Sequence, residues 1–288
     1  MIEINKPNIT IGIPTYKRSG SLLKTLKSLN LQTYKKFKIL VSVNGAGEEI
    51  VEYKKIESDL EGNLNIKFYF QNKNIGTLNN HFYLLQKCKT EFFMWSADDD
   101  LISPSCLEDL LCLLKNNREA VTAVPNWELV NKNYKKKILT PSHFHQKNTL
   151  IRIINYCNIS DDAFFHGLHK TKNLKKCSFL GFWKPNSNLI SRWAYVYLFD
   201  LVIQGKILFD PKLKAKWTNH NTENKHYKKN SIHPIIGRFE NHIKTININY
   251  LYLAKIIKWK KFYFLPIIFP LLVYFAIRDL LFGQKIYK

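Results

Sequence analysis

The sequence predicts an α/β protein built on a doubly wound, mostly parallel sheet. Short apolar or β-branched runs alternate with amphipathic segments through about the first hundred residues. Turn residues such as Asn44-Gly45-Ala46-Gly47 close several of these runs. Polar side chains gather directly after the runs, at the carboxyl ends of the expected strands, which is where such sheets bind ligands.

The elements follow in a regular order. The expected strands of this region are 9–14, 37–43, 66–70 and 92–95. The expected helices begin at Ser19 (with Leu22, Leu23, Leu26 and Leu29 on one face), at Glu48, at Thr77 and near Leu107. Beyond about Val121 the pattern loosens, and we expect strands at 121–124, 128–130, 207–209 and 215–217, a basic loop at 132–137 and a helix over 193–201.

Composition limits the partners and the compartment. The chain has 288 residues and a formal net charge of +22, which favours an acidic partner such as nucleic acid, an anionic membrane or a phosphorylated small molecule. Its five cysteines form no CxxC pair or zinc-like cluster, so reduced thiols in a cytosolic compartment are expected. Residues Met1 to Lys6 lack the apolar run of a secretory signal.

The C-terminal segment differs in composition from the rest. A basic helix is expected over 232–253, and residues 262–277 carry no charge but contain two prolines. Because a spanning helix needs about 20 apolar residues, a helix lying in the membrane interface fits this basic, aromatic segment better. The alternative is a buried helix packed on the globular part. We therefore expect three parts: 1–120, 121–225 and a membrane-associating helical extension over 226–288.

Three adjacent carboxylates, Asp98, Asp99 and Asp100, follow the apolar run 92–95. Like charges side by side repel, so a positive group is expected to hold them together. A divalent metal carrying a phosphate is the natural candidate, because hard cations take carboxylate oxygens. The alternative is a helix N-terminus, since acidic residues favour the first turn of a helix and Ser103-Pro104 can begin one.

These motifs, in this order, resemble those of the family 2 glycosyltransferases. Pro14-Thr15-Tyr16-Lys17-Arg18 follows the first strand, Asn44-Gly45 the second and Asn74-Ile75-Gly76 the third, and the acidic cluster comes last. The resemblance covers residues 8–115 well and continues loosely to about 220. It implies a GT-A fold, a nucleotide-sugar donor and transfer with inversion.

The resemblance implies a donor site made by these motifs. Its expected nucleotide-sugar-binding residues are Pro14, Thr15, Tyr16, Arg18, Asn44, Asn74, Gly76, Asn79 and Asp98. Thr15 offers a hydroxyl, Tyr16 a stacking face and Arg18 a partner for a diphosphate. Val43 stands where the family usually has a base-contacting Asp, so Asn44 either supplies the missing acceptor or is simply a turn residue.

The resemblance also implies a bound Mn²⁺ or Mg²⁺. Counting back from Pro104, Asp99 takes the place of the metal ligand, and Asp100 is the alternative because the register of a triplet is ambiguous. His220, after the last expected strand, is a candidate third ligand. A lone histidine is more often structural.

The general base is harder to place. The family often carries an Asp before an aromatic residue, but Ser191-Arg192-Trp193 offers no acid here. The preferred candidates are Asp162 and then Asp161, which lead into an aromatic-glycine loop; a helix cap is the alternative role for this pair. Asp200 and His166 are further candidates.

The leading hypothesis is a metal-dependent, inverting hexosyltransferase at the cytoplasmic face of a bacterial inner membrane. Its donor would be a nucleotide-sugar, with UDP as the default. Its acceptor would be a lipid-linked glycan in the assembly of lipopolysaccharide, another surface polysaccharide or a glycoprotein glycan, and no nucleic acid would take part. The alternatives are a basic nucleic-acid-binding protein and a non-catalytic relative with the same fold.

Overall fold

A computed structural model describes residues 8–45, 47–131, 134–138, 144–159, 163–177, 193–218, 270, 273 and 274. The strands are β1 (Ile9–Thr15), β2 (Phe37–Val43), β3 (Ile66–Phe70), β4 (Phe92–Trp95), β5 (Asp100–Ile102), β6 (Ala120–Asn131), β7 (Tyr134–Ile138), β8 (Leu168–Lys170) and β9 (Lys206–Thr218). The α-helices are α1 (Ser19–Asn30), α2 (Ile50–Leu60), α3 (Thr77–Lys87), α4 (Cys106–Asn116), α5 (Thr149–Ile159), α6 (Thr171–Lys175) and α8 (Trp193–Gln204). Two short 3₁₀ helices are η1 (Gly47–Glu49) and η3 (Ala163–His166).

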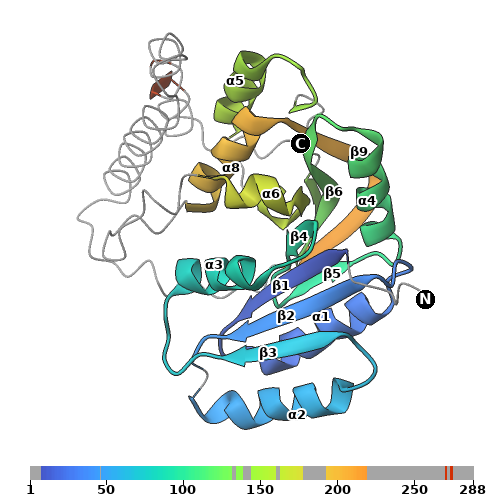
Figure 1. The fold of residues 1–288 in the computed structure, drawn as a ribbon, viewed down its shortest axis with the longest axis vertical. Coiled ribbons are helices and arrows are strands. Elements are labelled where there is room, and N and C mark those ends of the chain that lie inside the picture. Colours follow the sequence, from blue (N-terminus) through green and yellow to red (C-terminus); the bar gives the residue numbers. More distant parts are fainter. Residues whose placement is uncertain are drawn as a thin grey trace.

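Within these residues the strands form a single nine-stranded sheet, in the order β3-β2-β1-β4-β8-β6-β9-β5, with β7 added on β6 (Figure 1). The first four strands in this order are mutually parallel. Their carboxyl ends therefore lie at the same edge of the sheet, where the loops that follow β1, β2, β3 and β4 meet.

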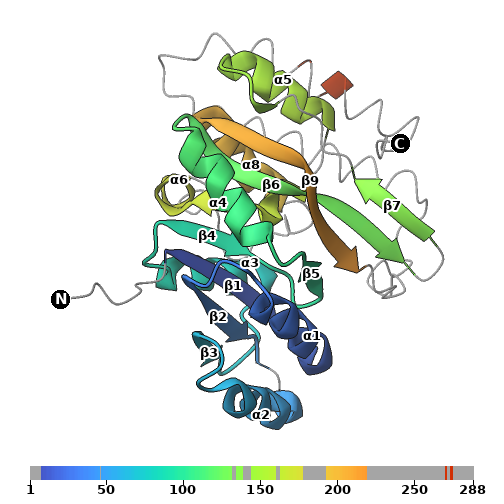
Figure 2. The same ribbon diagram turned by 90° about the vertical axis from the view of Figure 1, so that its right-hand side faces the viewer.

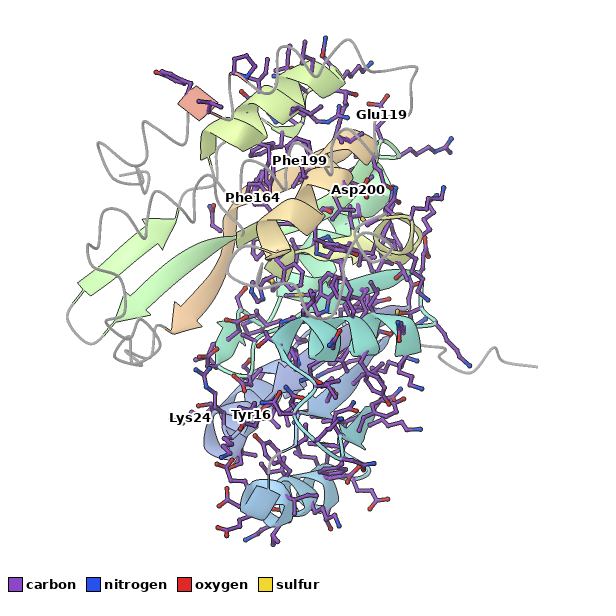
Figure 3. The ribbon with its side chains drawn as sticks, turned by 90° about the vertical axis from the view of Figure 1, so that its left-hand side faces the viewer. Tyr16, Lys24, Glu119, Phe164, Phe199 and Asp200 are labelled. Atoms are coloured by element: carbon purple, nitrogen blue, oxygen red, sulfur yellow. The ribbon has the colours of Figure 1, made fainter. Side chains whose placement is uncertain are left out.

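Helices cover both faces of this parallel part. In Figure 2 α1 lies in front of the sheet, whereas α3 lies in front in Figure 3, which is viewed from the opposite side. α1 buries Leu22, Leu26 and Leu29 against the core, as expected for apolar residues spaced three and four apart. The doubly wound arrangement expected from the alternating pattern is confirmed.

The second part of the sheet is mixed. β8 is antiparallel to both β4 and β6, β9 is parallel to β6, and the short β5 is antiparallel to the end of β9. The pairing Asp100 with Trp217 brings the end of β9 beside the acidic triplet. The end of β9, from the C-terminal part of the described chain, therefore lies at the same edge of the sheet as the triplet from the N-terminal part.

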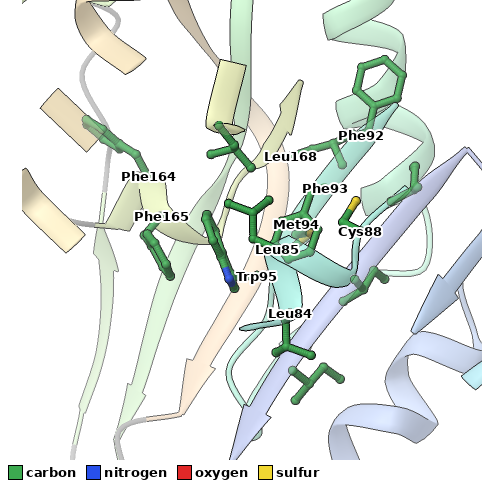
Figure 4. Packing of buried hydrophobic residues seen from close by; sticks show 14 of the residues in the cluster. Leu84, Leu85, Cys88, Phe92, Phe93, Met94, Trp95, Phe164, Phe165 and Leu168 are labelled. Atoms are coloured by element: carbon green, nitrogen blue, oxygen red, sulfur yellow. The ribbon is translucent and has the colours of Figure 1, made fainter. Parts of the chain in front are cut away.

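An aromatic cluster joins the two parts of the sheet. Trp95, at the end of β4, is fully buried and stacks on Phe165 of η3, with 4.2 Å between ring centroids and 14° between planes (Figure 4). Tyr197 of α8 and Phe82 of α3 meet the Trp95 ring edge-on. This cluster fixes η3 against β4, directly beside the acidic triplet.

A buried arginine organises the outer helices. Arg152 of α5 is 4% exposed, and its guanidinium donates to the carbonyls of Val202 and Ile203 at the end of α8. It also donates to the carbonyls of Gln146 and Lys147, which precede α5. Carbonyls at the end of a helix lack intrahelical donors, so Arg152 ties the beginning of α5 to the end of α8.

The structure corrects two expectations. The separate strands expected at 121–124 and 128–130 are one strand, β6, and those at 207–209 and 215–217 are likewise one strand, β9. The loop expected at 132–137 is wrong, because residues 134–138 form β7 and pair with β6. In the part of the chain that the structure describes, no helix is long and apolar enough to cross a membrane. The expected interfacial helices over 226–288 fall almost wholly outside that part.

Candidate functional site

The site begins with a buried carboxylate, Asp98, just beyond the carboxyl end of β4. Asp98 is 5% exposed, and its Oδ2 accepts a hydrogen bond from Thr15 Oγ1 at 2.7 Å. Thr15 is the last residue of β1, the neighbour of β4 in the sheet. The parallel pairing thus brings together two residues that are 83 positions apart in the sequence.

A chain of hydrogen bonds supports this contact. The Thr15 hydroxyl has one hydrogen, which it gives to Asp98, so Tyr53 of α2 must donate to Thr15 across their 3.0 Å contact. The Tyr53 oxygen in turn accepts the backbone N–H of Arg18 at 2.9 Å. Every donor therefore points toward the carboxylate, and hydrogen bonds aligned in this way strengthen one another.

Opposing effects act on the charge of Asp98. Burial raises its pKa above the ordinary value, because a carboxylate loses hydration inside the protein. The hydrogen bond from Thr15 and the positive charge of Arg18 oppose that rise, whereas the neighbouring Asp99 adds to it. Thr15 and Arg18 are therefore the two groups that favour the ionised form.

Arg18 bridges two members of the acidic triplet. Its Nη1 lies 3.2 Å from Asp98 Oδ1 and 3.1 Å from Asp99 Oδ2. The two carboxylates are nearly buried, whereas the Arg18 side chain is 40% exposed. The positive group that the sequence requires beside the triplet is, in this structure, a side chain of the protein itself.

The backbone before Arg18 is strained. Lys17 has a φ of 53°, and it is the single non-glycine residue with a positive φ among those the structure describes. Such a conformation costs about 1 kcal/mol in a residue with a side chain. The turn ends β1 and begins α1, and it places Arg18 where its N–H meets Tyr53 and its guanidinium meets the carboxylates.

Asp100 faces the other half of the molecule. It is 2% exposed, its Oδ2 accepts the Ala97 N–H at 2.9 Å, and His166 Nδ1 of η3 lies 3.4 Å from the same oxygen. Burial raises the pKa of Asp100, and the nearby His166 opposes that rise. The expected alternative metal ligand is thus engaged in joining the loop after β4 to η3.

Two loops of the expected donor site are fastened by an asparagine pair. Asn44 Oδ1 accepts the Ile75 N–H at 2.8 Å, and Asn44 Nδ2 donates to Asn74 Oδ1 at 3.0 Å. Asn74 Oδ1 also accepts the Gly76 N–H at 2.8 Å. Both ends of the Asn44 amide are therefore used within the protein, which supports its role as a loop residue rather than as a substitute for the family's acidic side chain.

Gly45 permits this close approach. Its φ is +69°, and a Cβ placed there would lie 2.5 Å from the backbone nitrogen of Asn74. Gly76, with a φ of +83°, precedes the first turn of α3, and Asn79 Nδ2 donates to the Ile75 carbonyl at 2.8 Å. The helix N-terminus and its flanking loop thus open at the same sheet edge as Asp98.

The structure brings together most of the expected site residues that it describes. Pro14 pairs with Ser42 in the β1–β2 ladder, and Tyr16 is 42% exposed in the loop after β1. Asp161, Asp162 and His220 lie outside the described residues. Asp200 is buried in α8 and lies in the half of the molecule away from Tyr16 (Figure 3).

The donor set fits a cation although no complete metal cluster is formed. Within the described residues, no three His, Cys, Asp or Glu side chains are arranged to hold a metal ion. Mg²⁺ and similar ions, however, are commonly held by one or two carboxylates together with substrate phosphates. Asp98 and Asp99 already hold the positive charge of Arg18 between them, so this position accepts a cation.

Tyr53 is the site residue that sequence reasoning missed. It is a fully buried residue of α2, and its hydroxyl completes the hydrogen-bond chain to Asp98. On sequence grounds alone it is one tyrosine in an amphipathic helix. A polar hydroxyl on the apolar face of that helix is the signal that a hydrogen-bond partner lies beneath it.

Comparison of the sequence with known proteins identifies a family and two relatives. The family profile described as "Glycosyl transferase family 2" matches residues 10–175. An uncharacterized glycosyltransferase of Rickettsia bellii (strain RML369-C) is 28% identical over 130 residues, which are 45% of this chain and 18% of the relative. One of Rickettsia typhi (strain ATCC VR-144 / Wilmington) is 27% identical over 146 residues, which are 50% of this chain and 44% of the relative. The chain thus spans less than half of either relative.

Solved structures share the fold at low sequence identity. TarS 1–349 of S. aureus in complex with UDP-GlcNAc has a TM-score of 0.68 and 16% identity, with 96% of this chain and 74% of that chain covered. The mannosyltransferase PcManGT from Pyrobaculum calidifontis, in complex with GDP-Man and Mn²⁺, has a TM-score of 0.57 and 11% identity, covering 95% and 74%. The expected GT-A fold is therefore confirmed.

Proposed function

Because this chain belongs to glycosyl transferase family 2, we propose that it transfers a sugar from a nucleoside diphosphate sugar to an acceptor hydroxyl with the help of a divalent metal ion. The observation that carries the proposal is the network of Thr15, Asp98, Arg18 and Asp99 at the carboxyl ends of β1 and β4. It combines two nearly buried carboxylates for a cation with a half-exposed arginine for phosphate oxygens.

The donor would lie along the loops that follow β1, β2, β3 and β4. Tyr16 offers an exposed ring beside the base, and the backbone N–H groups at the start of α3 favour an anion. We place a UDP-sugar first. TarS has been solved with UDP-GlcNAc and PcManGT with GDP-Man, so both bases belong in the test.

Asp99 would be the principal ligand of a bound Mn²⁺ or Mg²⁺, with Asp98 beside it, Asp100 as the alternative and His220 as a further candidate. A bound metal ion would supply charge neutralisation for the departing nucleoside diphosphate. Thr15, supported by Tyr53, would hold the Asp98 carboxylate in place, and Arg18 would bind the diphosphate.

The acceptor side of the proposal concerns proton removal. Inverting transfer needs a base that takes the acceptor hydroxyl proton as the anomeric carbon is attacked from the opposite face. Asp162 is our first candidate for this base, then Asp161. The stacking of Phe165 on Trp95 supports this choice, because it fixes the segment that immediately follows the pair beside the acidic triplet.

The pathway and location belong to the same proposal. We place the protein at the cytoplasmic face of a bacterial inner membrane, held by the basic and aromatic residues of 226–288, and acting on a lipid-linked glycan in surface polysaccharide or glycoprotein glycan assembly. The net charge of +22 supports an anionic surface and a phosphorylated acceptor.

The direct test is a thermal-shift panel with UDP-GlcNAc, GDP-Man, CMP and dTDP sugars, each with and without Mn²⁺. A ligand that binds the folded state raises its stability by RT ln(1 + [L]/Kd), so even modest affinity gives a shift. We expect stabilisation by one nucleotide class, dependent on Mn²⁺ and absent in Asp99→Asn. If no nucleotide sugar shifts the melting temperature under any condition, the proposal is wrong; oligonucleotides tested alongside would then identify a nucleic-acid-binding protein.

A further inference from the structure

We infer that Arg18 is a displaceable counter-cation: it holds the place of the divalent metal ion in the ligand-free protein and leaves that place when a nucleoside diphosphate arrives. Metal and nucleotide would then bind in an interdependent way. This inference rests on the proposed function, because it concerns how the same site is filled.

The first observation is that one nitrogen serves two carboxylates. Arg18 Nη1 lies 3.2 Å from Asp98 Oδ1 and 3.1 Å from Asp99 Oδ2. Guanidinium more often pairs with one carboxylate through two parallel hydrogen bonds. Here a single N–H-bearing atom lies between oxygens of two side chains, as a metal ion shared by two ligands would.

The second observation is that the Arg18 backbone is anchored by hydrogen bonds whereas its side chain is partly exposed. The Arg18 N–H is held by the buried Tyr53 hydroxyl at 2.9 Å, and the Arg18 carbonyl accepts the Leu22 N–H in the first turn of α1. The side chain, by contrast, is 40% exposed. An arginine anchored in this way can exchange its carboxylate partners for phosphate oxygens, which suit the same planar group.

The third point is electrostatic. A divalent cation on Asp99 and the Arg18 guanidinium at its present position would lie within a few ångströms of each other and repel strongly at a nearly buried site. Arg18 must therefore move before a metal ion binds. Without nucleotide, moving the guanidinium costs it its two carboxylate partners, which opposes metal binding. A diphosphate offers the guanidinium new anionic partners and so removes this cost.

Thermodynamic linkage turns this competition into a measurable coupling. If nucleotide relieves the competition, it strengthens metal binding by some factor, and the metal must strengthen nucleotide binding by the same factor. Removing the Arg18 charge should shrink that factor. The effects on the two ligands should have opposite signs: tighter binding of metal alone, and weaker binding of nucleotide at saturating metal.

The experiment measures Mn²⁺ binding to the full chain by the loss of the electron paramagnetic resonance signal of free Mn²⁺, with and without UDP and GDP. In Arg18→Gln we expect Mn²⁺ alone to bind about tenfold more tightly than in the wild type. The nucleotide that strengthens Mn²⁺ binding in the wild type should strengthen it about tenfold less in the variant.

Two variants control for charge and structure. Arg18→Lys keeps a cation at the site and should leave Mn²⁺ binding weak. Lys24→Gln removes one exposed charge from α1, the helix that follows Arg18, and should change the Mn²⁺ affinity less than twofold. Far-ultraviolet circular dichroism confirms that each variant is folded.

The outcomes separate the two claims. If nucleotide and Mn²⁺ bind together in the wild type but Arg18→Gln binds Mn²⁺ alone no better, the displacement inference is wrong and the proposed function stands. If Mn²⁺ binds equally more tightly to Arg18→Gln and to Arg18→Lys, the inference is also wrong, because the change in affinity would not depend on the charge at position 18. If no variant binds Mn²⁺ even with UDP or GDP, both the inference and the proposed metal-nucleotide site fail.

Discussion

Replacing Thr15 with valine tests the buried hydrogen-bond chain on which Asp98 depends. Valine has nearly the shape of threonine, so Thr15→Val creates no cavity and removes only the hydroxyl. That hydroxyl is buried, donates to Asp98 at 2.7 Å and receives a hydrogen bond from Tyr53 at 3.0 Å.

The expected loss of stability follows from the two contacts. A hydrogen bond to a charged group contributes roughly 1.5–3 kcal/mol, and a neutral one about 1 kcal/mol. Because both partners stay buried and lose their bonds, we expect Thr15→Val to lower the free energy of unfolding by about 3 kcal/mol. Urea unfolding followed by circular dichroism at neutral pH measures this change.

Thr15→Ser is the matched control for Thr15→Val. It keeps the hydroxyl and loses one buried methyl group, which costs about 1 kcal/mol. The difference between the two variants therefore isolates the hydroxyl. If Thr15→Val costs no more than Thr15→Ser, the hydroxyl does not support Asp98 and the argument from the hydrogen-bond chain fails.

Three further predictions concern the loops and the core. Gly45→Ala should lower the free energy of unfolding by about 2 kcal/mol, because a positive φ and a 2.5 Å contact with the Asn74 nitrogen both oppose a side chain. Gly47→Ala is the control: its φ is +61° but the space around it is open, so it should cost only about 1 kcal/mol, and an equal cost for both variants would contradict the contact argument. Phe165→Ala should cost about 3–5 kcal/mol in urea unfolding because it removes the ring stacked on Trp95, whereas a cost under about 1 kcal/mol would mean that the stack does not hold η3. Burial lowers the pKa of His169 to about 4, so the neutral side chain stabilises the fold above pH 6.5 and this contribution is lost as the pH falls from 6.5 toward 4. His169→Gln should therefore reduce the dependence of the unfolding free energy on pH by up to about 3 kcal/mol in that range, and an unchanged dependence would refute the assignment.

The neutral state of His169 follows from its partners. Its Nε2 contacts the Phe165 carbonyl at 3.0 Å, and a carbonyl oxygen can only accept, so Nε2 carries the hydrogen. Its Nδ1 is then the acceptor for the Thr122 hydroxyl at 2.9 Å. Protonation would replace that acceptor with a donor and bury a positive charge at a position where no carboxylate of the described residues forms an ion pair with it, which is why acid should weaken the fold.

The parallel part of the sheet could be predicted because its signals are local. Each of its strands is a short apolar run followed by a turn or a polar cluster, and all four are observed close to their expected bounds. The acidic triplet is also readable, since three adjacent carboxylates after a buried strand require a positive neighbour. That this neighbour is Arg18 is a long-range fact, which depends on the pairing of β1 with β4.

The second part of the sheet misled prediction for physical reasons. Pro125 in β6 and Pro211 in β9 read as breaks, yet both strands continue through the irregularity in their register that lies beside these prolines. β7 is rich in lysine, which reads as a loop, but within the described residues it pairs with β6 alone, as an edge strand does. Tyr53 lies in α2 and contacts Thr15 of β1, and no local sequence pattern predicts that contact.

Whether the acidic triplet forms a metal-dependent transferase site can be tested by the release of nucleoside diphosphate from a nucleotide sugar in the presence of Mn²⁺, compared between the wild type and Asp99→Asn. When no acceptor is present, water is the nucleophile left to take the sugar, so we expect slow hydrolysis and accumulation of UDP or GDP in a coupled assay. We expect release from one donor class by the wild type, dependent on Mn²⁺ and lowered by at least about 100-fold in Asp99→Asn. Release that is equal in both proteins, or that does not require the metal, would contradict a site built on Asp98, Asp99 and Arg18.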